Sequence, residues 1–422
     1  MSRPLSRHLL RLLAPALGAA SLMVACTDAP PVVREVDTGP LVADSSGIRI
    51  VEATAPSWGT TPQWTVGDSF TVDIGAPAQP LVGVAPVLRL SDGRIVVVNG
   101  AQQSILYFDP TGKLLTTAGG RGTEEGQFHG LGWIGRGPAD TVVAFDFLTR
   151  RLTLFDSQGK YARVAVLAPA DPKVAAEPLA TFPDGSVLFR LGRPANPFPG
   201  KRGEVIRDSA SYMRFGLDGL PQEALGRFPQ GESWGVQVRK EGPPAPFPVP
   251  FGLVTAAALR ADTMLIGTGA SFEVASIGPD GKPVGVLRAP VEREPVTPEM
   301  SNSYTSAAVT RIRTGAKSLN TPLDSTLIQS LERAPFPARM PAFGRMLVDR
   351  TGALWLSAPL NPPASASSWN VFAPDGTWLG TVTTPDGLRV DEIGADYVVG
   401  VWRQPHGQEH VRVYPLSRGT GS

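Results

Sequence analysis

Short apolar segments alternate with polar turns along most of the chain, and the spacing of the turns repeats. Over Pro86–Val164 two copies follow each other, each with four apolar segments separated by tight turns. In the first copy 19 positions separate Gly93 from Gly112, and in the second 19 separate Asp140 from Gly159. Val, Ile, Phe and Tyr dominate between the turns, and these residue types favour strands. The pattern predicts two consecutive four-stranded antiparallel units.

The same turns recur in four more copies. First turns fall at Gly185, Asp262, Gly352 and Asp396, and the basic period of about 45 residues is typical of a propeller blade. The last copy lacks a fourth strand, and the strand-like segment Phe70–Gly75 has no other place. We therefore expect an all-β fold, a six-bladed β-propeller closed by an N-terminal strand. Two separate β domains are the alternative.

Two of the intervals between successive first turns are longer than the others. Their extra residues lie in three connections. These are the second connection of the third copy and the links that follow the third and fourth copies. In a four-stranded blade these connections lie on one face, and long loops on a rigid scaffold commonly carry function. The sequence thus predicts one insertion-bearing functional face.

One insertion has a helical pattern of its own. Residues 291–340 contain two segments in which a capping residue precedes Pro, Thr297–Glu299 and Thr321–Asp324, which is typical of helix starts. We expect a pair of helices covering part of the ring. The proline-rich segment Glu241–Phe251 predicts a stiff loop packed across the propeller.

The first residues have the pattern of an export signal. Arg3, Arg7 and Arg11 precede an apolar stretch too short to span a bilayer, and small residues lead to Cys26. Leu22–Cys26 resembles the bacterial lipobox, which implies lipidation of Cys26, and the following Thr27 implies the outer membrane. Residues 1–25 are then a lipoprotein signal peptide, 26–46 a tether and 47–422 the propeller. An ordinary cleaved signal with a stray cysteine is the alternative.

The charge and composition of the chain mainly exclude certain partners and bonds. The formal net charge is +1, and no basic cluster suggests a nucleic-acid partner. Cys26 is the only cysteine, so a disulfide within the chain is impossible. The 46 glycines and 42 prolines suit a fold with many turns.

Two segments carry a family resemblance. Gly119–Phe128 and Phe145–Lys160 both resemble the segment between blades in NHL-repeat propellers. The chain as a whole resembles the uncharacterised six-bladed propeller lipoproteins of bacteria. This resemblance implies the fold and an envelope location. Some NHL-type relatives are lactonases, lyases or sensor domains, so the fold does not select a function.

Candidate metal ligands are few. After the signal the histidines are His129, His406 and His410, which could share a metal ion or could be ordinary solvated loop residues. Three aspartates at strand ends could bind calcium through oxygen, or simply cap turns: Asp73, Asp146 and Asp349. The sequence requires no cofactor and leaves the metal content open.

Aromatic and arginine side chains near connections are candidates for ligand contacts, because such residues dominate binding hot spots. The predicted set is His129, Trp133, Arg136, Arg150, Arg151, Trp234, Trp369, Trp402, Arg403 and His406. We expect a lipid-anchored binding or scaffolding module that recognises an envelope protein, a glycan or a small molecule on the insertion-bearing face. The alternative is a metal-dependent, lactonase-like hydrolase or lyase with its site in the central channel. A third reading is an envelope assembly factor acting through the proline-rich segment and the helices.

Overall fold

The computed structural model describes residues 39–75, 80–168, 171, 173–193, 198–318, 325–359, 367–404 and 407–419. The predicted signal peptide, Cys26, His406 and the second predicted helix start, Thr321–Asp324, lie outside these ranges. Within them, neither helix combines the length and the apolar character needed to cross a bilayer.

Short antiparallel sheets make up most of the described chain, which confirms the expected β character. The first three have four strands each: β5 (Val84–Arg89), β6 (Ile95–Asn99), β7 (Ser104–Phe108) and β8 (Leu114–Gly119); β9 (Leu131–Arg136), β10 (Val142–Asp146), β11 (Arg151–Phe155) and β12 (Tyr161–Val166); and β13 (Ala175–Thr181), β14 (Val187–Gly192), β16 (Ser209–Phe215) and β17 (Pro221–Pro229). The predicted turns at Gly93, Gly112 and Gly159 separate these strands and have positive φ, as close antiparallel connections require.

Three further sheets follow the same plan. They contain β20 (Ala256–Arg260), β21 (Thr263–Gly267), β22 (Glu273–Ile277) and β23 (Pro283–Arg288); β24 (Met346–Val348), β25 (Leu354–Ser357), β26 (Ser367–Phe372) and β27 (Trp378–Thr384); and β28 (Leu388–Ile393), β29 (Tyr397–Arg403) and β30 (Glu409–Arg418), completed by strands from the start of the chain.

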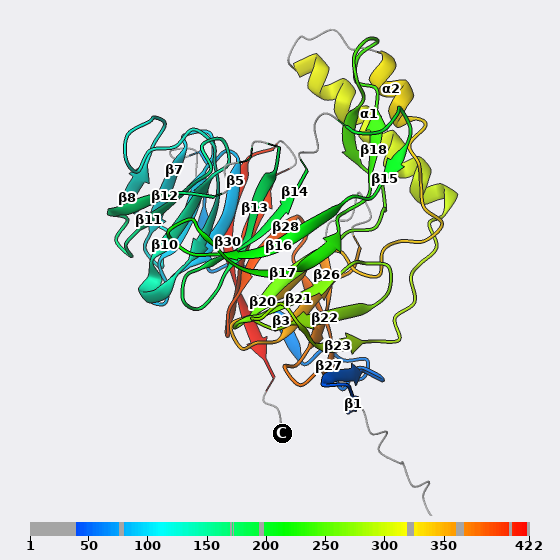
Figure 1. Cartoon of the computed structure of the whole chain (residues 1–422), viewed down its shortest axis with the longest axis horizontal. Coiled ribbons are helices and arrows are strands. Elements are labelled where there is room, and N and C mark those ends of the chain that lie inside the picture. Colours follow the sequence, from blue (N-terminus) through cyan, green and yellow to red (C-terminus); the bar gives the residue numbers. More distant parts are fainter. Residues whose placement is uncertain are drawn as a thin grey trace, which may run out of the picture. The chain divides into compact units, whose positions relative to one another are not determined.

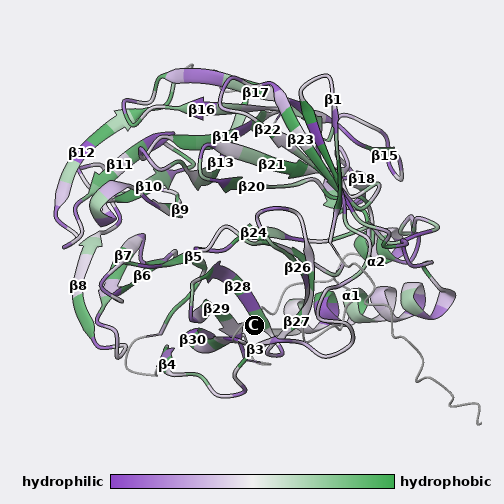
Figure 2. Ribbon diagram, turned by 90° about the horizontal axis from the view of Figure 1, so that it is seen from below, coloured by the Kyte–Doolittle hydropathy of each residue, from purple (hydrophilic) through white to green (hydrophobic). Residues whose placement is uncertain are grey.

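The first strands of these six sheets contact one another in a closed cycle. The order is β5, β9, β13, β20, β24, β28 and back to β5. Figure 2 shows these six strands around a common centre, with the later strands of each sheet farther out.

Apolar side chains fill every space between neighbouring sheets. Strands β6, β7 and β10 are buried along their whole length, because each has a neighbouring sheet on both faces. Alternate residues of β6 therefore enter two different cores: Val96 and Val98 pack toward the second sheet, whereas Ile95 and Val97 pack toward the sixth. Six such clusters join successive sheets, including the last to the first.

The start of the described chain crosses the outer edges of three sheets. β2 (Ile48–Glu52) pairs with β23, the backbone N–H groups of Ser57 and Trp58 donate to carbonyls of β27, and β3 (Trp64–Val66) and β4 (Val72–Ile74) both pair with β30. The pairing of β4 confirms that the segment Phe70–Gly75 supplies an outer strand to the last sheet.

The last residues of the predicted tether form a strand in the structure. The sequence predicts a tether over residues 26–46, and within it β1 (Leu41–Ser45) pairs antiparallel with β2. Ser46 and Gly47, both at positive φ, form the turn between them. Two positive φ values match the twist of a two-residue hairpin, so the Ser-Gly pair nucleates a hairpin here.

The three insertions come together in one structure, which we call the cap. The cap consists of β15 (Val205–Ile206), β18 (Ser233–Val236), β19 (Ala245–Pro248), α1 (Pro298–Ser318) and α2 (Ser325–Leu331). β15 comes from the second connection of the third sheet and pairs with β18 from the following link, and the helices come from the next link. Figure 1 shows the helices beside β15 and β18. The expectation that the insertions share one face is confirmed.

The cap has an apolar core of its own. Trp234 and Val236 of β18 pack with Val309 of α1 and Leu331 of α2. The first helix begins at the predicted Thr297-Pro298 pair, and the Thr297 hydroxyl accepts from the N–H of Met300 at 3.3 Å. The proline-rich segment is not the expected loop, because four of its residues pair with β18 as β19.

Candidate functional site

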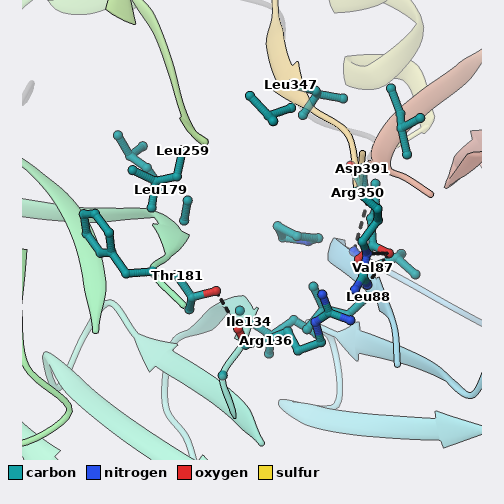
Figure 3. A pocket seen from close by; sticks show the side chains of 18 of the residues that line it. Val87, Leu88, Ile134, Arg136, Leu179, Thr181, Leu259, Leu347, Arg350 and Asp391 are labelled. Carbon is teal, nitrogen blue, oxygen red and sulfur yellow. Dashed lines mark hydrogen bonds and ion pairs between the residues drawn. The ribbon is translucent and has the colours of Figure 1, made fainter. Parts of the chain in front are cut away.

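An axial cavity of about 940 Å³ lies among the six first strands. All six contribute to its wall, and Figure 3 shows side chains from several of them pointing into one space, among them Val87, Ile134, Leu179 and Leu259. The volume falls within the range of about 300–1,000 Å³ found for small-molecule sites.

Paired polar groups line the end of the cavity at which the first strands finish. Arg350 Nη2 donates to Glu392 Oε1 at 2.7 Å and to the carbonyl oxygen of Arg89 at 2.7 Å. The Tyr397 hydroxyl donates to the same Glu392 carboxylate, and the Arg89 guanidinium lies 4.2 Å from the centre of the Tyr397 ring. Burial and the nearby Glu392 raise the pKa of Tyr397, so this phenol remains a donor at neutral pH. The arginine and carboxylate groups at this end of the cavity are therefore largely paired with one another.

Two arginines and one carboxylate lie toward the other end, at which the first strands begin. Asp391 of β28 is 5% exposed and accepts from Arg389 Nε and Nη2, each at 3.0 Å, and from the N–H of Val87 at 3.3 Å. Arg345 Nη2 lies 3.9 Å from Asp391 Oδ1, beyond hydrogen-bond distance. The Arg389–Asp391 pair is therefore complete without Arg345.

Arg345 has an unusual position, because it lines two cavities. It immediately precedes β24, and its backbone N–H donates to the Ser357 hydroxyl at 2.8 Å. Its side chain is 37% exposed, and the residue contributes to the walls of both cavities. Burial lowers the pKa of Arg345, Asp391 opposes this shift and Arg389 adds to it, but an arginine in this setting stays protonated at neutral pH.

The second cavity, of about 430 Å³, lies where the cap links join the ring of first strands. Its wall is mostly apolar, and Arg345 is the one charged residue among those described there; the others include Val249, Phe251, Val254, Met340, Pro341, Met346 and Pro359. Phe251 also packs edge-on against Tyr304 of α1, with ring centres 5.6 Å apart. This cavity has wall residues from a cap link, such as Val249, and shares Arg345 with the axial cavity.

Two of the predicted site residues line the axial cavity. Trp133 lies within β9 and is 6% exposed, and Arg136 ends that strand with Nη1 3.8 Å from Asp140 Oδ1. Arg136 therefore lies at the first connection of its sheet rather than on the insertion-bearing face, since a first connection leaves from the end of the first strand. Figure 3 shows it beside Ile134 and Thr181.

Two other predicted tryptophans belong to apolar cores. Trp234 is 3% exposed inside the cap, and Trp369 is 1% exposed between the fifth and sixth sheets. Both rings are covered by apolar neighbours, so neither has a free face on which a ligand could stack. Large apolar rings commonly occupy the inward-facing positions of strands.

Trp402 and Arg403 are the last residues of β29, a central strand of the last sheet. The Arg412 guanidinium lies 3.7 Å from the centre of the Trp402 ring, and Arg403 Nε donates to Glu409 Oε1 at 2.8 Å. His410 Nδ1 lies 2.8 Å from Asp73 Oδ1, which links β30 to the closing strand β4. These contacts hold the closure of the last sheet together.

His129, Arg150 and Arg151 lie in the second sheet and the loops beside it. His129 is exposed, Arg151 begins β11, and Arg150 Nη1 donates to the Val174 carbonyl at 2.6 Å. None of them lines either of the two cavities described above. The described members of the predicted set are thus dispersed over several sheets, and of these Trp133 and Arg136 line the axial cavity.

Asp146 organises the loops around His129. Its carboxylate accepts from the backbone N–H groups of His129, Gly130, Leu148 and Thr149 at 2.7–3.0 Å. Burial opposes ionisation, but these four hydrogen bonds outweigh it and hold the pKa of Asp146 below its ordinary value.

This carboxylate should make stability depend on pH in the acid range. A depressed folded-state pKa contributes stability above the unfolded pKa of about 3.9, and the contribution is lost as pH falls through the folded value. Asp146→Asn should lower the free energy of unfolding at pH 7 by about 1–3 kcal/mol, because donors lose a charged acceptor. Urea unfolding of both proteins should show this gap shrinking below pH 4. Glu124→Gln, at an exposed neighbour, should show no gap, and a gap that stays constant to pH 2.5 would contradict the assignment.

The three aspartates that are candidate calcium ligands already accept hydrogen bonds from other groups of the protein. Asp73 contacts His410 and Arg412, Asp146 accepts four N–H groups, and Asp349 accepts from Trp355 and Arg418. Within the described ranges, no three His, Cys, Asp or Glu side chains are grouped so as to hold a metal ion.

Sequence reasoning missed Arg345, Arg389 and Asp391. Arg389 and Asp391 alternate along the first strand of a repeat, Leu388–Ile393, and polar residues at alternate positions of a first strand were the available signal. Arg345 lies at the end of the longest link, where no repeat register applies.

Comparisons with known proteins find only distant similarity, and only to solved structures. No protein-family model and no curated protein matches the chain. Among solved structures, a DUF4221 family member from Bacteroides vulgatus is 8% identical, with 84% of this chain and 99% of that chain covered and a TM-score of 0.48. Virginiamycin B lyase from Staphylococcus aureus is 11% identical, with 84% and 99% covered and a TM-score of 0.40. The calcium-binding protein regucalcin from Agrobacterium tumefaciens is 10% identical, with 83% and 97% covered and a TM-score of 0.38. At these values the likeness carries no argument about activity.

Proposed function

We propose that the chain is a six-bladed β-propeller, closed by its N-terminal strand, that is exported and held at the outer membrane through Cys26. Support for six blades comes from the cycle of six first strands and from the six apolar clusters between successive sheets. Support for export and anchoring comes from the basic, apolar and small-residue order of residues 1–26.

The protein acts as a binding module, with its site where the cap joins the axial cavity. The observation that carries this proposal is the convergence of three insertions on one cap, together with a cavity of about 430 Å³ at its base that shares Arg345 with the axial cavity. A mostly apolar cavity with a single charged group is the usual composition of a small-molecule site.

Binding is favoured over acid–base chemistry because the carboxylates along the axial cavity are engaged. Asp391 is held by Arg389, Glu392 by Arg350, Asp349 by Arg418, and Asp140 accepts from Ser91. A carboxylate whose oxygens already accept hydrogen bonds has fewer free lone pairs for a proton or a metal ion.

Metal analysis of the purified chain separates this proposal from the metal-dependent hydrolase or lyase. We expect clearly less than one metal ion per chain and no change in melting temperature when a chelator is added. A stoichiometric metal whose removal abolishes a hydrolytic activity would overturn the binding proposal and direct attention to the axial cavity.

A further inference from the structure

Arg345 is a cation without a dedicated partner. Asp391, the nearest carboxylate, already receives two hydrogen bonds from Arg389 and one from Val87, and its contact with Arg345 is 3.9 Å long. The guanidinium makes no hydrogen bond with another residue of the described chain. Arg345, Arg389 and Asp391 together carry one net positive charge.

The apolar cavity next to this charge sets the rest of the ligand's chemistry. Val249, Phe251, Met340 and Met346 line it, and no described residue there offers a second charge. Methionine side chains adapt to irregular apolar ligands, and an apolar ligand portion displaces poorly held water from such a wall. A ligand that fits therefore has an apolar body and a single anionic group.

We infer that this cavity binds an amphiphile with one anionic head group and an apolar chain, with Arg345 as the residue that recognises the head group. The inference rests on the proposed binding function and adds the ligand class. A guanidinium offers two parallel N–H donors to a carboxylate, so a monocarboxylate is the matching head group.

Decanoate is the probe, titrated by calorimetry into the full-length chain carrying Cys26→Ala, so that no acyl chain competes. Decan-1-ol has the same body without the charge, and acetate has the charge without the body. We expect one decanoate per chain, with decanol and acetate each binding at least about 10-fold more weakly. Arg345→Gln should weaken decanoate about 10-fold or more and leave decanol unchanged.

The matched control is Arg227→Gln, because Arg227 is an exposed arginine on the outer strand β17. It should bind decanoate like the parent chain. Arg345→Lys keeps the charge and should recover part of the affinity, and the melting temperature of each variant checks that it is folded. Equal binding of decanoate and decanol, unchanged in Arg345→Gln, would overturn anion recognition while leaving the binding function standing. No binding of either probe would overturn the ligand class, and metal analysis would still decide the proposed function separately.

Discussion

A chain that begins at Pro80 will fail to form the native fold. It lacks β1–β4, so β30 loses both strands that pair with its outer edge. Val72 and Ile74 are 7% and 4% exposed and belong to the core between the last and first sheets. Each contributes about 1.5–3 kcal/mol by burial. Their loss together with the exposed edge is a large fraction of a typical stability of about 5–15 kcal/mol.

The control is a chain that begins at Thr38 and keeps all four strands. It should unfold in urea with the midpoint of the full-length chain and elute from gel filtration at the volume expected from that chain. The shorter chain should aggregate or unfold at a much lower midpoint, because an unpaired edge strand recruits other chains. Equal midpoints and equal elution for both would mean that the N-terminal strands do not close the last sheet.

Asp349→Ala should strongly destabilise the fold. The carboxylate is fully buried and accepts from Trp355 Nε1 at 2.9 Å and from Arg418 Nη2 at 2.8 Å. Arg418 also lies 4.1 Å from the centre of the Trp64 ring, so one group connects the fifth sheet, the sixth sheet and the N-terminal segment. Its removal leaves the partly exposed Arg418 without its carboxylate and the buried N–H groups of Trp355 and Ala353 without an acceptor, which together costs about 3–5 kcal/mol.

Asp375→Ala provides the comparison within the same sheet. Asp375 also caps a turn, accepting from the N–H of Thr377 at 2.9 Å, but it is exposed. Its loss should cost about 1 kcal/mol or less, because water replaces the acceptor. Urea unfolding measures both variants against the parent chain, and similar costs for the two would show that the Asp349 network contributes little.

The repeat was readable from the sequence because each turn leaves a local signature. Asp-Gly and x-x-Gly turns separate alternating apolar runs, so Gly93, Gly112 and Gly159 mark connections without any knowledge of tertiary contacts. The closing strand was readable as well, since the last copy lacks a strand and the segment before the first copy has one to spare.

The candidate site was not readable in the same way. Trp234 and Trp369 looked like contact residues because tryptophan is common at binding sites, but a large ring on a strand packs inward when a neighbouring sheet or helix covers it. Arg345 is a candidate site residue because the fold brings together two segments that are distant in the sequence. These are the end of the cap link and the first strand Leu388–Ile393. Such long-range pairing leaves no periodic pattern in one sequence.

The most direct test of the binding account is a crystal structure of the chain grown with decanoate. We predict density for the probe in the cavity at the base of the cap, with its carboxylate within hydrogen-bond distance of the Arg345 guanidinium and its chain along Val249, Phe251 and Met340. An empty cavity beside an occupied site elsewhere, or a cap that leaves Arg345 open to bulk solvent, would contradict the account.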